Sequence, residues 1–272
     1  MRWLQDITLG LYLPRDSAVH RLDPRAKLVV CAVLMTAVFV PGGGPVVLCA
    51  VPPLVLGVWL SRLPVGLVLR GLRPFVWLFA FTALLHAVTT PGQAWFTVPG
   101  FRVPVTGQGL ARGVAVAGQL AAAVTFSSLL TLTTRPTELV WGLERLGAPL
   151  ARLGLPVGEF CVSMLLAIRF FPLVQQEAER LRLALAARGA EGAAGGLRRR
   201  IQNLSPLLAS LFRRVLGRAE HLALAMELRG FVPGRPLGAW RPYRFATAEW
   251  LACGLAGLTL GLALWLRRWP AA

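Results

Sequence analysis

Two seven-residue stretches, LALAARG (183–189) and LAMELRG (224–230), end in the dipeptide Arg-Gly. The guanidinium of arginine carries five N–H donors in a rigid fork, a geometry that fits grooves lined by carboxylates and carbonyls on another protein. An arginine in the last turn of a helix, followed by glycine, is also an ordinary way for a helix to end. The two Arg-Gly dipeptides could therefore serve helix capping or docking on another protein, and neither role requires proton transfer.

Position, and not frequency, separates these two hypotheses. Arg-Gly occurs four times, and the 28 arginines and 28 glycines of the chain predict roughly three occurrences by chance. Arg70 and Arg112 lie beside apolar runs, whereas Arg188 and Arg229 lie 41 residues apart in one basic segment, each at the end of a long helical pattern. Only the second two can form a matched pair of contacts. The candidate docking residues are Ala187, Arg188, Gly189, Leu228, Arg229 and Gly230.

Residues for catalysis or metal binding are few and scattered. Lys27, the only lysine, follows no glycine-rich turn, and the chain has no G-x-x-x-x-G-K-[ST] motif, so we expect no ATP site of the P-loop kind. His20, His86 and His221 lie far apart, and the four cysteines form no C-x-x-C pair. We predict no catalytic residue, metal site or cofactor site in this chain. For His86, which falls in an apolar run, an interhelical hydrogen bond is favoured over an ion site.

The composition is that of a membrane protein. Of the 272 residues, 56% are hydrophobic, and the mean hydropathy is +0.61. A membrane-spanning helix needs about 17 to 25 mainly apolar residues. Asp23 is expected to cap the first such helix, with Pro24 at its first position. The chain is predicted to be all-α and polytopic, with about five transmembrane helices at 24–40, 46–60, 74–90, 110–132 and 248–266.

The positive charges of the loops predict an orientation. Arginine and lysine are abundant before residue 28 and in 61–73, absent from 41–45, and represented only by Arg102 in 91–109. Loops rich in these residues stay in the cytoplasm. The N-terminus is therefore predicted to be cytoplasmic and the C-terminus to lie outside, although Arg267 and Arg268 oppose the second assignment.

The segment 133–247 is predicted to form a cytoplasmic helical domain between the spans in 1–132 and the last span in 248–272. It holds 17 arginines and 8 glutamates, which gives a net charge of +9. Two long helices are expected, at about 156–189 and 197–230, separated by a glycine-rich break. In the second, apolar residues recur at helical spacing while the charged residues occupy mostly other faces, so we expect its apolar face to pack against the first helix.

The apolar run 160–174 is a candidate for a sixth span. It has about 15 residues, contains Arg169 and Pro172, and continues into a charged sequence. A charge at the centre of a span costs at least about 2.5 kcal/mol. We interpret this run as an apolar helix that lies against the membrane domain.

Together these features resemble a known family, the transmembrane (T) components, EcfT and CbiQ, of energy-coupling factor transporters, which are ABC importers of vitamins and transition-metal ions. The resemblance covers HRLDPRAKL (20–28), the early membrane helices, the paired tips and the final span. Ala187-Arg188-Gly189 matches the Ala-Arg-Gly motif of the family in full. In the second tip Leu228 replaces alanine, which the looser X-Arg-X form of the motif accommodates.

The resemblance implies a non-catalytic subunit of a bacterial cell-membrane transporter. In this family two long coupling helices cross, and the arginine at the end of each docks in a groove of one ABC-type ATPase subunit. The two ATPases bind ATP and magnesium, and the crossed helices pass their motion to a small hydrophobic substrate-binding (S) component. Arg188 and Arg229 would be the two contacts with the ATPases.

Two other classes of protein explain parts of the pattern. An integral-membrane enzyme acting on lipid would use the basic domain to hold phosphate headgroups, but the predicted spans contain no Asp and only Glu249 among the glutamates. A nucleic-acid-binding protein would explain the charge, but no stacking aromatics are interleaved with the arginines in a recognisable module. We expect no nucleic-acid partner, and the lipid enzyme stays as the alternative.

Overall fold

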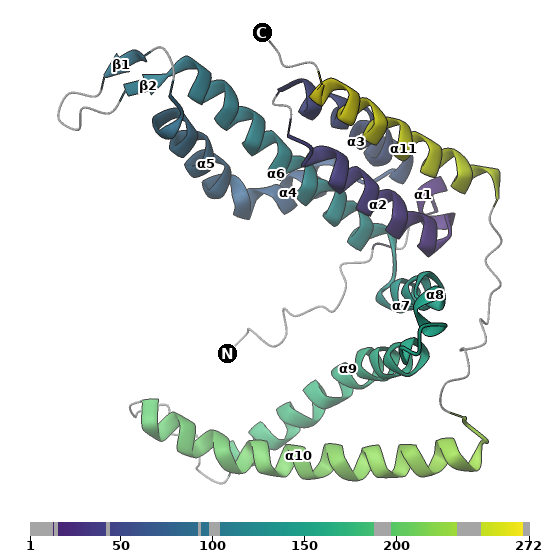
Figure 1. Cartoon of the computed structure of the whole chain (residues 1–272). Coiled ribbons are helices and arrows are strands. Elements are labelled where there is room, and N and C mark those ends of the chain that lie inside the picture. Colours follow the sequence, from purple (N-terminus) through teal and green to yellow (C-terminus); the bar gives the residue numbers. More distant parts are fainter. Residues whose placement is uncertain are drawn as a thin grey trace. The chain divides into compact units, whose positions relative to one another are not determined.

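A computed structural model describes residues 13, 16–41, 44–91, 94–97, 104–187, 197–232 and 246–268 (Figure 1). These residues are almost entirely helical, which confirms the predicted all-α class. The exception is a short antiparallel ribbon formed by β1 (Ala94–Thr97) and β2 (Pro104–Thr106), which the sequence pattern did not predict. The described residues divide into two compact units, one within Leu9–Gly142 and Arg241–Ala272 and the other within Leu143–Trp240.

The first unit, here called the bundle, is built from helices that alternate in direction. In chain order these are α1 (Ala18–Arg21), α2 (Pro24–Val38), α3 (Gly44–Ser61), α4 (Val65–Leu72), the short 3-10 turn η2 (Arg73–Phe75), α5 (Val76–Thr89), α6 (Gly107–Thr133) and α11 (Thr247–Arg267). α6 packs against α2, α3, α4 and α5, and α2 packs against α3, α6 and α11. The start of α2 contacts the start of α11 through Asp23 and Glu249, and the end of α6 through Lys27 and Thr133, so α2 and α11 run in one direction and α6 in the other. α3 runs in the same direction as α6, since Val47 lies near Gly118 and Gly57 near Leu129.

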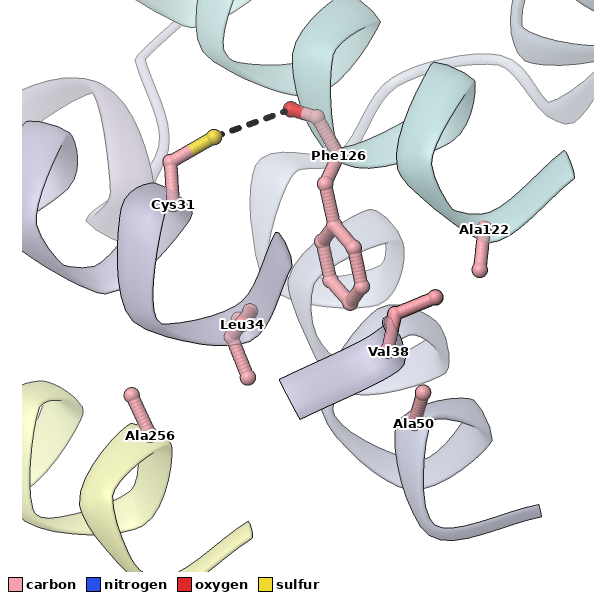
Figure 2. Close-up of a cluster of buried hydrophobic side chains, with 7 residues drawn as sticks. All are labelled: Cys31, Leu34, Val38, Ala50, Ala122, Phe126 and Ala256. Carbon is pink, nitrogen blue, oxygen red and sulfur yellow. Dashed lines mark hydrogen bonds between the residues drawn. The ribbon is translucent and has the colours of Figure 1, made fainter. Parts of the chain in front are cut away.

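The bundle core combines a few large apolar side chains with alanines. Figure 2 shows Leu34 and Val38 of α2 beside Phe126 of α6, with alanines from α3, α6 and α11 facing them. The thiol of Cys31 points at the Phe126 carbonyl, 3.8 Å away. In lipid, helices associate through close packing and not through exclusion of water, so small residues at the contacts favour assembly.

α5 and α6 approach each other most closely at two glycines of α6. A Cβ atom on Gly109 would lie 2.5 Å from the carbonyl oxygen of His86, and one on Gly113 would lie 2.6 Å from that of Ala83. Both distances are below van der Waals contact. These glycines therefore set the separation of the two helices.

A polar cluster joins three helix ends at one end of the bundle. Asp23 caps α2 by accepting a hydrogen bond of 3.0 Å from the backbone N–H of Arg25, as the sequence predicted. Its own backbone N–H donates to Glu249 of α11 at 3.3 Å. The buried ammonium of Lys27 donates to the carbonyls of His20 and Thr133, both at 3.1 Å, and so satisfies a backbone oxygen at the end of α6.

Exposed tryptophans mark both ends of the bundle. Trp59 near the end of α3 and Trp250 at the start of α11 lie towards the end where α6 terminates. Trp265 lies near the opposite end, at the end of α11. Tryptophan is enriched at the two membrane interfaces, so this distribution is that of a membrane-spanning bundle.

Five described helical segments are long and apolar enough to cross a membrane, but they differ from the predicted five in one member. Four are α3, α4 to α5, α6 and α11, which correspond to predicted spans. The fifth is α9 (Val157–Ala187), and α2 does not qualify, because with 15 residues it is shorter than the roughly 17 that a span requires. The length argument against a span at 160–174 was therefore wrong, because α9 contains an 18-residue stretch that is apolar enough to cross a membrane; Arg169 remains as an argument.

Candidate functional site

The second unit consists chiefly of two long helices, α9 and α10 (Leu197–Leu228). They lie within the ranges predicted for the two long helices, and each continues through an internal proline, Pro172 or Pro206. At 31 and 32 residues, each is about 47 Å long. α7 (Pro136–Leu146), which contains the boundary between the units, and α8 (Ala148–Ala151) precede them. Figure 1 shows α9 meeting α10 at an angle.

α10 ends in a well-formed C-terminal cap at the second predicted tip. Gly230 has a φ of +71°, in the left-handed region, and its N–H donates to the carbonyl of Glu227 at 2.9 Å. The N–H of Phe231 donates to the carbonyl of Met226 at 3.0 Å. These two bonds form a Schellman motif, which requires a residue such as glycine at position 230. Gly230 is therefore a capping residue, and Arg229 is held beside it on the exposed end of the helix.

The first predicted tip is described only in part. Ala187 is the last residue of α9 and is exposed. Arg188 and Gly189 lie outside the described residues. The geometry of the second tip is thus known at Leu228, Arg229 and Gly230. That of the first tip stays a prediction at Arg188 and Gly189.

The apolar face of α10 is only partly buried by α9. Leu207, Leu211 and Leu222 are partly buried, but Leu208 and Phe212 are 57% and 67% exposed. The expectation that this face packs as a whole against α9 was therefore too broad. The apolar positions of α10 cover a wider arc than one crossing helix can bury, and the outer part remains uncovered.

Charged residues, and not only apolar ones, line the crossing of α9 and α10. An open hollow of about 320 Å³ lies there, lined by apolar residues of both helices together with Glu177, Arg214 and Arg218. Arg214 donates a hydrogen bond to the Glu177 carboxylate. The sequence pattern placed the charged residues of this helix mostly on other faces than the apolar one, and Arg214 and Arg218 are exceptions that line the hollow. Because Glu177 and Arg214 are 37 residues apart, spacing along one helix gave no signal for their contact.

The remaining predicted positions are less informative. The predicted interhelical hydrogen bond of His86 is not found among the described residues: its Nδ1 lies 3.0 Å from the carbonyl oxygen of Thr82, four residues earlier in the same helix. Among the described residues, no three His, Cys, Asp or Glu side chains gather in a way that would hold a metal ion.

Comparisons with known proteins agree on one family. The family model of CbiQ, described as cobalt transport protein, matches residues 15–238. The energy-coupling factor transporter transmembrane protein EcfT of Thermanaerovibrio acidaminovorans is 40% identical over 265 residues, which cover 97% of each chain. The proteins of the same name from Heliobacterium modesticaldum and Bacillus subtilis are 37% and 35% identical, over 96% and 85% of this chain and 98% and 87% of their own lengths.

Proposed function

This chain belongs to the CbiQ and EcfT family of transmembrane components of energy-coupling factor transporters, and from this premise we propose that it couples two ATPase subunits to a substrate-binding S component. The chain itself is a membrane component of a multi-subunit transporter. In the proposed cycle it binds neither ATP nor magnesium, both of which belong to the ATPase subunits. The cargo is a vitamin or a transition-metal ion, and it is carried by the S component.

The observation that carries the proposal is the exposed, capped end of α10. The Schellman motif at Gly230 fixes the last turn, so the neighbouring Arg229 projects from a rigid helix end instead of a loop. A guanidinium held in this way is suited to a carboxylate-lined groove. We propose that Arg229 docks in one ATPase subunit and Arg188, at the matched end of the first long helix, in the other. The two tips then comprise Ala187, Arg188 and Gly189, and Leu228, Arg229 and Gly230.

Uncovered apolar residues supply a second contact in the proposal. Leu208, Phe212 and Leu216 recur every four residues on α10, so they lie on one face, and all three are exposed. A row of large apolar side chains favours a hydrophobic partner. We assign this row, together with apolar surfaces of the membrane helices, to the S component. The proposed location is the bacterial cell membrane, with the second unit in the cytoplasm and the C-terminus outside.

The test uses charge reversal at both tips. Arg188→Glu, Arg229→Glu and the double variant are co-expressed with the cognate ATPases and S component, and co-purification of the ATPases and ATP-driven uptake are measured. We expect each single variant to weaken assembly and the double variant to abolish uptake, because a carboxylate at the tip repels an acidic groove.

A matched control is Arg213→Glu, which reverses an exposed arginine in the middle of the same helix α10. It changes the net charge of the chain by the same amount as Arg229→Glu, and we expect it to leave assembly intact. Normal assembly and uptake in the Arg188→Glu and Arg229→Glu double variant would refute the proposed docking.

A further inference from the structure

One carboxylate lies where the two long helices cross. Glu177 is in the second half of α9, and its side chain is only 18% exposed. Its Oε1 accepts a hydrogen bond from Nη1 of Arg214 on α10, and its Oε2 lies 3.8 Å from Nη1 of Arg180, three residues further along α9. The Glu177–Arg214 contact joins the two helices, whereas the bidentate pair of Glu179 with Arg182 lies within α9.

The apolar contacts around this ion pair do not by themselves define one alignment of the helices. Phe170, Leu173 and Val174 of α9 face Val215 and Ala219 of α10 across the hollow of about 320 Å³. Apolar contact is non-directional, and an open hollow leaves room for one helix to slide or rotate on the other. A charge-assisted hydrogen bond is directional and favours one register.

We propose that the Glu177–Arg214 ion pair fixes the register at which α9 and α10 cross, so that force applied at the end of one helix moves both; this inference rests on the coupling function proposed above. Glu177 and Arg214 are positioning residues and touch no substrate. The Arg214 side chain is 61% exposed, so only loss of Arg214 leaves a poorly solvated charge, that of Glu177, but loss of either residue releases the alignment. The ATPases then still bind and hydrolyse ATP, but less of their motion reaches the membrane.

The crossing holds one carboxylate but two arginines of α10, so loss of Glu177 and loss of Arg214 should have different effects. Glu177 is a single carboxylate, whereas Arg214 has a neighbour, Arg218, that lines the same hollow one turn along α10. Loss of Arg214 leaves Arg218 as a substitute partner, but loss of Glu177 leaves no carboxylate among the residues that line the hollow. Substitution of Glu177 is therefore the more damaging change.

The experiment measures uptake per ATP hydrolysed by the complete transporter in liposomes. The variants are Glu177→Arg, Arg214→Glu and the double variant with the two charges exchanged. Glu179→Arg is the control, because it reverses a carboxylate two residues away whose partner, Arg182, lies on the same helix. We expect Glu177→Arg to lower the ratio about tenfold or more, Arg214→Glu to lower it less, and the exchange to restore it to within about threefold of the wild type.

Three results would overturn the inference: a wild-type ratio in Glu177→Arg, a double variant no better than the weaker single variant, or an equal loss in Glu179→Arg. If Glu177→Arg does not fold, Glu177→Gln keeps the shape and removes the charge. A ratio reduced about threefold or more supports the inference, and a wild-type ratio in that variant contradicts it.

The same measurements separate this inference from the function on which it rests. If the Arg188→Glu and Arg229→Glu double variant retains uptake, the docking proposal fails. If that variant is inactive while Glu177→Arg keeps the wild-type ratio, docking stands and only the role of the ion pair is refuted.

Discussion

The bundle and the pair of long helices differ most in how much of their surface they bury. The bundle has a core of interlocked small and large apolar residues, and even its lysine is enclosed. In 143–187 and 205–232, only Cys161 and Glu144 are buried. The bundle therefore has a packed core of its own, whereas α9 and α10 leave most of their apolar and charged surface uncovered.

The two regions also use cations differently. In the bundle, Lys27 donates to two backbone carbonyls and ties helix ends together. In the second unit, most arginines whose burial the structure describes are exposed, where a guanidinium can contact a partner. Substitutions in the bundle should therefore act on stability, and substitutions in α9 and α10 should act on assembly and coupling.

The largest expected effect on stability comes from replacing a phenylalanine of the bundle core with alanine, and the same replacement in α10 serves as the comparison. Phe126→Ala empties part of the bundle core and should lower the free energy of unfolding by about 3 kcal/mol, because the surrounding helices cannot fully close the cavity. Phe212→Ala removes a side chain that is 67% exposed and should change stability by less than about 0.5 kcal/mol while weakening retention of the S component. Thermal unfolding in detergent and co-purification measure the two effects. Equal destabilisation by both variants would contradict the contrast.

A smaller loss is expected from adding one methyl group between α5 and α6. Gly113→Ala places a Cβ 2.6 Å from a backbone oxygen and should destabilise the bundle by about 1 to 3 kcal/mol, because the helices must separate. Gly254→Ala in α11, where a Cβ meets nothing within 4 Å, is the matched control and should be neutral or slightly stabilising. A neutral Gly113→Ala would show that close approach of α5 and α6 is not required.

Removing the buried lysine should cost about 1 to 2 kcal/mol. Lys27→Met keeps the bulk of the side chain but leaves the carbonyls of His20 and Thr133 without their donor. Arg25→Met, two residues earlier, removes a partly exposed cation with a 3.8 Å contact to Asp23 and should cost less than about 1 kcal/mol. Unfolding midpoints of the two variants compare a buried with a partly exposed cation at the same helix end. If Arg25→Met proves as costly as Lys27→Met, the backbone bonds are not the source of the effect.

The smallest effect on global stability is expected at the end of α10. Gly230→Ala forces a residue with a Cβ into the left-handed region, at a cost of about 1 kcal/mol. The last turn should fray, which hydrogen exchange at Phe231 would detect as lost protection. Gly217→Ala, in the middle of α10 with open space around it, should leave exchange unchanged at that position. Unaltered protection in Gly230→Ala would show that the cap does not hold the helix end.

The sequence was a good guide to the bundle because its signals are local. Runs of apolar residues and the charges between them predicted four of the five long apolar segments, and Asp-Pro at 23–24 predicted the start of α2. The shortness of α2 was not foreseen, because Phe39 and Val40 continue the apolar run although the helix ends at Val38. The continuity of α9 through Pro172 was predicted, because the helical pattern of 156–189 runs on past the proline into a charged sequence.

Side-chain partners at the crossing could not be predicted. The apolar residues of α10 spread over so wide an arc that Leu211 and Val215 face α9 no more obviously than Leu208 and Phe212 do. The phase of α10 is set by where α9 crosses it, which is a tertiary property. Hence the end of α10 at Gly230 could be predicted from the sequence, while the Glu177–Arg214 pair required the structure.

The most direct test of the account is physical contact between the tips and the ATPases. A photo-crosslinking residue placed separately at positions 188 and 229 is irradiated in the assembled transporter, with position 213 as the control. We predict adducts with an ATPase subunit from both tips and none from the control position. Adducts from 188 and 229 to lipid or to the S component alone, with no ATPase adduct, would contradict the claim that these two arginines couple the chain to its energy source.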